Sequence, residues 1–97
     1  MILVTTDEVA GRRIGRVLGL VRGNTIRARH LGEDIMAHLR NAGGGEIIEY
    51  TKMLAEARAL GTDAVLAIRF QTADVMKGAA ELMCYGTAVT LLPEDAG

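Results

Sequence analysis

A helix end followed by an almost continuous apolar run constrains this chain more than any other feature. Gly61 follows the apolar Leu60, at a position where a helix end favours a residue that tolerates positive φ. After two polar residues comes the run AVLAIRF, residues 64–70, which contains a single charge at Arg69. Such a run predicts a central strand covered on both faces.

The remaining C-terminal residues predict a turn and a last strand. Residues 71–78, QTADVMKG, are expected to form a polar connection. From about Ala80 to Leu92 the side chains alternate between two sets, as in a strand. Pro93 ends this strand, because proline has no amide hydrogen to give to a ladder.

A longer strand is expected near the N-terminus, from Ile14 to Ala28, after a short one over residues 2–5. Glycine at two strand positions, as in this segment, predicts a bulge or a close approach of another backbone. The dipeptide Gly23-Asn24 is typical of a hairpin turn and predicts a break within the segment.

Two helices are expected between these strands. The first runs from about Leu31 to Asn41, where an apolar residue recurs every fourth position. Three successive glycines, residues 43–45, then predict a loop. The second helix spans about Glu46 to Leu60, with acidic residues in its first turn, where the helix dipole favours them.

The strand–helix–helix–strand–strand order does not alternate as a doubly wound fold would. It predicts one α+β domain over residues 1–97, with two layers: a mostly antiparallel sheet and two helices on one face. The other sheet face is too apolar to sit in water, which indicates a partner.

Composition points to association and excludes several classes. Hydrophobic residues make up 49% of the 97 residues, with only three aromatics, so much small apolar surface needs cover, and an oligomer is expected. The net charge of −1 argues against nucleic-acid binding. No run approaches the ~20 apolar residues of a membrane span, and the start lacks a basic signal-peptide region. With one cysteine, no intrachain disulfide can form, and the cytoplasm is the expected location.

Five segments of this chain resemble those of one known family: MILVTT, LGLVRG, the triple glycine, AEARALGTDAVLAIRF and YGTAV. The similarity covers nearly the whole chain, and the family is the YbjQ-like one, whose members are often labelled "putative heavy-metal-binding". The resemblance implies a subunit with dodecin-like architecture that assembles into a homo-oligomeric ring, commonly a pentamer. The second helix is about three turns shorter than is usual in the family, and Val75-Met76-Lys77-Gly78 stands where the family has a glycine-rich turn.

The family label prompts a search for metal ligands. The candidate ligands for a divalent or soft transition metal are Cys84, His30, His38 and Asp34. Asp34 and His38 are four apart and would share a helix face, but zinc usually needs four ligands. In a ring, Cys84 would recur around the axis and suit a soft metal, whereas the alternative is a buried structural cysteine.

Catalysis is not expected from this chain. Serine is absent, and no histidine lies near Cys84 in sequence, so a nucleophile with its base is not indicated. Two hypotheses follow: a non-catalytic ring-forming assembly module, or a protein that binds a soft metal or small ligand at the subunit interface.

Overall fold

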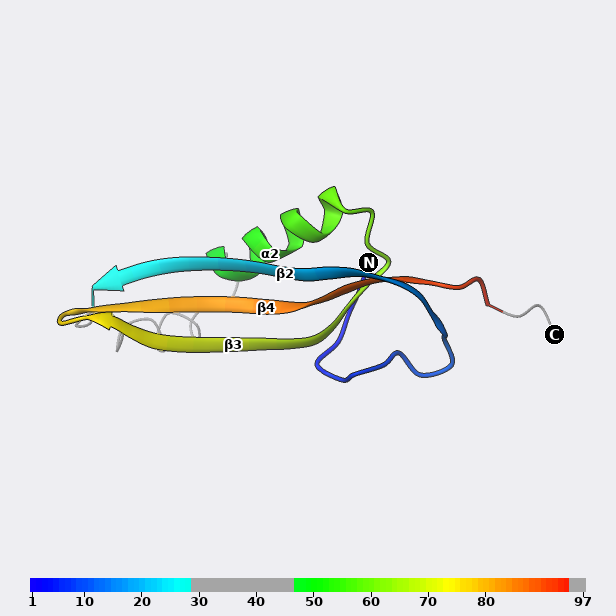
Figure 1. Cartoon of the computed structure of the whole chain (residues 1–97), viewed down its shortest axis with the longest axis horizontal. Helices are drawn as coiled ribbons and strands as arrows, with labels where there is room; N and C mark the ends of the chain where they lie inside the picture. The colour runs from blue at the N-terminus through cyan, green and yellow to red at the C-terminus, as the bar shows by residue number, and fades with distance from the viewer. Residues whose placement is uncertain (29–46, 95–97) are drawn as a thin grey trace.

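The computed structural model describes residues 1–28 and 47–94, which form one helix packed on a four-stranded sheet (Figure 1). The sheet order is β1-β3-β4-β2, with β3 and β4 in the middle. Strands β2 and β3 both pair antiparallel with β4, whereas β1 pairs parallel with β3. The α+β class is therefore confirmed, with a mixed sheet, and the first expected helix lies outside the described residues. The elements are β1 (Ile2–Leu3), β2 (Ile14–Ala28), α2 (Ile48–Ala59), β3 (Ala64–Met76) and β4 (Ala79–Leu91).

Strand β2 has the predicted bounds but does not turn back on itself. It runs unbroken through Gly23 and Asn24, which pair with Cys84 and Met83 of β4. The predicted hairpin at Gly23-Asn24 is therefore wrong. Gly23 instead lies directly beneath α2. A Cβ atom at this position would stand only 2.7 Å from the amide nitrogen of Met53, so the helix leaves no room for a side chain. The glycine serves the close approach of helix and strand.

Strand β3 is longer than the sequence predicts. The polar connection expected over residues 71–78 is wrong, since the strand continues to Met76 and only Lys77 and Gly78 form the turn. Gly78 has a φ of 84°, which glycine adopts without strain. The ladder with β4 satisfies the backbone of this polar segment, so pairing outweighs its weak strand propensity.

Bulges interrupt two of the strands. The bulge predicted in β2 is confirmed, because the register against β4 shifts on both sides of Val17 and Gly19 has a φ of 131°. In β3, Ala67 has a φ of 52° beside a second register shift. This bulge lets Val65 and Ile68 face the same side of the sheet, which regular alternation would forbid.

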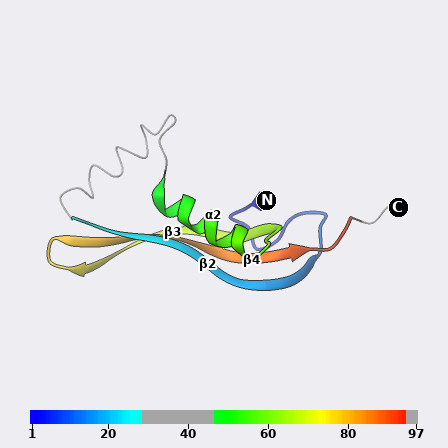
Figure 2. The ribbon, with the colours of Figure 1, turned by 90° about the horizontal axis from the view of Figure 1, so that it is seen from above.

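Helix α2 lies along one face of the sheet (Figure 2), and its bounds, Ile48–Ala59, fall within the predicted span of Glu46 to Leu60. It ends as predicted, with Gly61 at a φ of 74° and its amide donating to the Arg58 carbonyl. The core lies between this helix and the sheet, and its buried residues are Val21, Met53, Ala57, Val65, Ile68, Cys84 and Ala88.

The N-terminal segment covers part of the opposite face. Val4 and Val9 pack on a smaller buried cluster there, which includes Leu66 and Val89. The first residues of β3 are thus covered on both faces, as predicted for AVLAIRF, but the cover ends early. Phe70, at the end of that run, is 57% exposed.

Candidate functional site

Cys84 lies in the centre of the core rather than at a surface. Its side chain is fully buried between β4 and α2. The thiol donates a hydrogen bond to the thioether of Met53, with Sγ and Sδ 3.6 Å apart. Two polarizable sulfur atoms therefore meet inside the protein.

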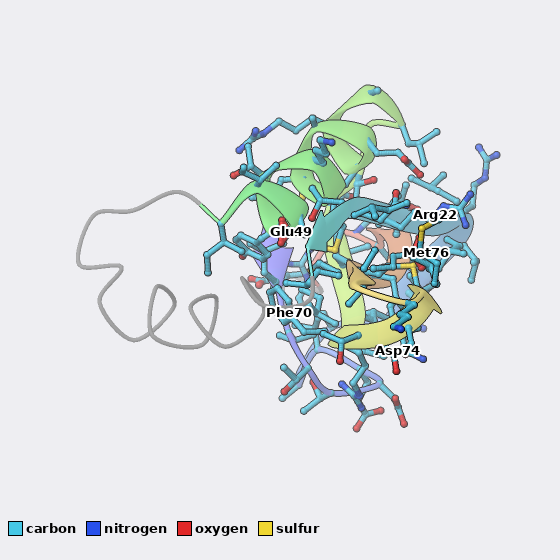
Figure 3. The ribbon with its side chains drawn as sticks, turned by 90° about the vertical axis from the view of Figure 1, so that its left-hand side faces the viewer. Arg22, Glu49, Phe70, Asp74 and Met76 are labelled. Atoms are coloured by element: carbon cyan, nitrogen blue, oxygen red, sulfur yellow. The ribbon has the colours of Figure 1, made fainter. Side chains whose placement is uncertain are left out.

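A buried carboxylate lies on the same helix face. Glu49 in the first turn of α2 is only 4% exposed and is followed one turn later by Met53. Burial, and secondly the negative charge of Glu49, raise the pKa of the Cys84 thiol to about 11. The thiol is therefore protonated at neutral pH and is a poor nucleophile. Figure 3 shows Glu49 and Phe70 on one side of the sheet and Arg22 on the other.

Of the predicted metal ligands, the described residues include Cys84 alone. His30, His38 and Asp34 lie outside the described residues, so a site that joins them to Cys84 stays a prediction. Within residues 1–28 and 47–94, no three His, Cys, Asp or Glu side chains are grouped as a metal centre would require. This part of the chain therefore does not fit a tetrahedral zinc site. It does bring together a thiol and a thioether, and these are ligand types that soft ions such as Cu(I) accept.

Met53 is the residue that sequence reasoning missed. Its signal was the spacing of Glu49, Met53 and Ala57, four residues apart, which places them on one buried helix face. The pattern does not say which strand residue this face meets, and so Cys84 emerged as its neighbour only in the fold.

The sheet face opposite α2, here called the open face, carries exposed apolar side chains. Val21 and Gly23 face the helix, so Leu20, Arg22 and Ile26 point the other way. Val17 is on the open face too, because it pairs with Val89 of the smaller cluster. Three of these β2 side chains are more than half exposed: Val17 at 67%, Leu20 at 60% and Ile26 at 65%.

A polar row crosses the middle of the open face. Tyr85 on β4 stands between Arg22 of β2 and Arg69 of β3 in the strand register. The guanidinium of Arg69 donates to the carbonyls of Thr5 and Ile68, at 2.8 and 2.9 Å. Arg69 thus fixes the N-terminal segment against β3.

Helix α2 is too short to cross a bilayer, and no other described segment forms a long apolar helix.

Proteins of known sequence and structure resemble this chain along almost its whole length. A UPF0145 protein of Methanosarcina acetivorans is 50% identical and covers 95% of this chain and 98% of its own. A UPF0145 protein of Clostridioides difficile is also 50% identical, over 99% of this chain and 96% of its own, in an alignment of 108 residues. Since this chain has 97 residues, that relative has residues that this chain lacks.

The fold has a counterpart among crystal structures. A protein of unknown function of the DUF74 family, from Pediococcus pentosaceus, superposes with a TM-score of 0.61 over 95% of this chain and 98% of its own. At 16% identity this likeness concerns the fold alone. The YbjQ family model, described as "Putative heavy-metal-binding", matches residues 1–92. The chain therefore belongs to the YbjQ family.

Proposed function

We propose that this protein is a non-catalytic assembly module whose copies associate through the open face of the sheet. The observation that carries the proposal is the exposure of Val17, Leu20 and Ile26 on the face opposite α2, which no helix among the described residues covers. Burial of what remains exposed would contribute roughly 1–2 kcal/mol for each side chain. A monomer would leave this surface in water, whereas an oligomer would remove it.

The properties of the described side chains support a non-catalytic role. The buried thiol of Cys84 is protonated, and no described trio of acidic, histidine or cysteine side chains converges. None of the relatives named above carries an enzyme name. The resemblance to the family supports a closed ring of copies, with five as the expected number, and a single thiol suits the reducing cytoplasm.

The mass of the purified protein in solution tests the proposal. Sedimentation velocity and native mass spectrometry should give an oligomer at micromolar concentration. The double variant Leu20→Thr/Ile26→Thr keeps strand-forming side chains but makes them polar, and it should dissociate. The matched control Ile48→Thr/Leu60→Thr makes the same change at two exposed apolar residues at the ends of the helix and should assemble as the original does. A monomeric original protein would refute the proposal.

A second candidate function is the binding of a soft metal ion. The observation that favours it is the 3.6 Å separation between Cys84 Sγ and Met53 Sδ, two donors of the kind that Cu(I) prefers. These two residues would hold the ion, and the carboxylate of Glu49 would place negative charge nearby. Competition with a chromogenic Cu(I) chelator under anaerobic conditions measures this binding. No uptake by the original protein, or equal uptake by Cys84→Ser, would remove this candidate.

A further inference from the structure

An arginine lies within the apolar part of the open face. Along β2, Arg22 is placed between Leu20 and Ile26, which are 60% and 65% exposed. Its guanidinium takes part in no ion pair or hydrogen bond among residues 1–28 and 47–94. Figure 3 shows Arg22 on the side of the sheet opposite Glu49. Association through the open face would therefore remove water from an uncompensated positive charge.

Two further hydrogen-bond donors stand level with Arg22 across the sheet. The strand register sets Tyr85 of β4 beside Arg22, and Arg69 of β3 beside Tyr85. Directly paired side chains begin roughly 5 Å apart at Cβ, so the three residues form one row. The Tyr85 hydroxyl has no hydrogen-bond partner within the described part of the chain. Arg69 donates to the Thr5 and Ile68 carbonyls through Nη1, which leaves Nε and Nη2 available.

No carboxylate of the described residues contacts this row. On β4, the acidic residue of the open face is Glu81, four positions from Tyr85, which corresponds to about 13 Å along a strand. Its carboxylate already accepts a hydrogen bond from the side-chain amide of Asn24, at 3.0 Å. Asp7 and Glu8, on the segment that follows β3, form no ion pair with either arginine. The row thus carries two positive charges without a counter-charge in contact.

We infer that the row Arg22–Tyr85–Arg69 binds a phosphate group, and that the bound anion allows the open face to be buried when copies associate. This inference rests on the proposed assembly and adds a ligand to it. An unpaired charge is costly to bury, whereas a guanidinium that holds an oxyanion through two hydrogen bonds is compensated. A phosphate group matches donors from three strands, because its oxygens accept from several directions, while a carboxylate offers only two oxygens.

Assembly should therefore depend on phosphate. Sedimentation velocity in millimolar inorganic phosphate, and in chloride of equal ionic strength, keeps charge screening constant between the two measurements. Phosphate is expected to lower the dissociation constant of assembly about tenfold, and by linkage the assembled protein should bind phosphate more tightly than the dissociated protein. Equilibrium dialysis with radiolabelled phosphate measures the binding directly. Glucose 6-phosphate tests the source of the group: a larger effect than that of phosphate identifies a phosphate ester as the ligand, and a smaller one identifies the free anion.

Two variants test the residues of the row. Arg22→Gln removes the charge but keeps a long polar side chain. In chloride it should assemble at least as tightly as the original protein, because no charge has to be desolvated, and phosphate should no longer change its dissociation constant. Tyr85→Phe removes the hydroxyl alone and should weaken phosphate binding about threefold or more. The matched control Arg58→Gln makes the first change at an exposed arginine of α2 and should retain the full effect of phosphate. Circular dichroism checks that each variant is folded.

The outcomes separate this inference from the proposed function. A protein that assembles equally in both anions and binds no phosphate overturns the inference and leaves the assembly standing. A protein that is monomeric in both refutes the assembly, and phosphate binding that requires Arg22 would then support the anion site alone. If Arg22→Gln and Glu81→Gln both weaken assembly, and do so equally in chloride and in phosphate, a carboxylate of a neighbouring copy is the partner of Arg22 and the inference is wrong.

Discussion

The thiol of Cys84 on β4 points at the thioether of Met53 on α2, with the two sulfur atoms 3.6 Å apart inside the core. This contact joins the helix to the central part of the sheet. The burial that makes the contact also raises the pKa of the thiol to about 11. Stability and pH are therefore linked through one side chain.

The stability of the protein should fall at high pH because of Cys84. The thiol pKa is about 11 in the folded protein against an ordinary 9.0, so the protonated thiol stabilises the fold fully below pH 9.0. This contribution, at most about 3 kcal/mol, is lost as the pH rises from 9 through 11. Urea unfolding across this range measures the loss. Cys84→Ala removes the titrating group, so its free energy of unfolding should depend less on pH. If the free energy of unfolding changes with pH equally in both proteins, the pH dependence does not come from Cys84.

Any binding of Cu(I) at the sulfur pair should depend steeply on pH. The ion must displace the thiol proton. At any pH below the thiol pKa, the apparent affinity should therefore increase about tenfold for each unit by which the pH is raised. Met53→Leu should weaken binding less than Cys84→Ser, because the thioether is a neutral and weaker donor than a thiolate. Chelator competition at three pH values checks both points. An affinity independent of pH would show that the ion is held elsewhere.

Gly23→Ala should destabilise the protein strongly. The new methyl group would meet the backbone of α2, 2.7 Å from the amide nitrogen of Met53, and backbone cannot move aside as a flexible side chain can. A loss of about 3 kcal/mol is expected for this overpacking. Gly61→Ala is the comparison, since nothing lies within 4 Å there and only the φ of 74° is unfavourable, which costs about 1 kcal/mol. If chemical denaturation shows that both variants lose the same free energy of unfolding, then α2 does not pack closely against Gly23.

Arg69→Ala should release the N-terminal segment from β3. Its guanidinium donates to the carbonyls of Thr5 and Ile68, and both bonds disappear with the side chain. The expected cost is about 1–2 kcal/mol, and it should be local. Hydrogen exchange should speed up at the amide of Ala67, which donates to the segment, but not in the centre of β4. The control Arg58→Ala, on the exposed side of α2, should leave this exchange unchanged.

Much of the secondary structure could be predicted from local pattern. Glycine after an apolar helix face marked the end of α2, and alternation with a terminal proline marked β4 to within one residue. For β2 the bounds were predicted and a bulge was one of the two alternatives given for its glycines, although the hairpin expected inside it was wrong. These features depend on neighbouring residues alone, because helix ends, strand alternation and proline act over a few positions.

The candidate site was predictable only in part. Cys84 was singled out, and burial as a structural cysteine was one of two alternatives for it. Its partner Met53 and the buried carboxylate of Glu49 could not be found, because the sequence does not reveal which strand a helix face will meet. Contacts between residues 31 or more positions apart arise from packing and not from local propensity.

By itself, the sequence determined the family, the α+β class, the end of α2 and the apolar character of the strands. The tertiary structure decided what local signals left ambiguous. Gly23 lies within a strand and in close contact with α2, and not in a turn, because the helix packs directly on it. Residues 71–76 form part of a strand because β4 pairs with their backbone amide and carbonyl groups.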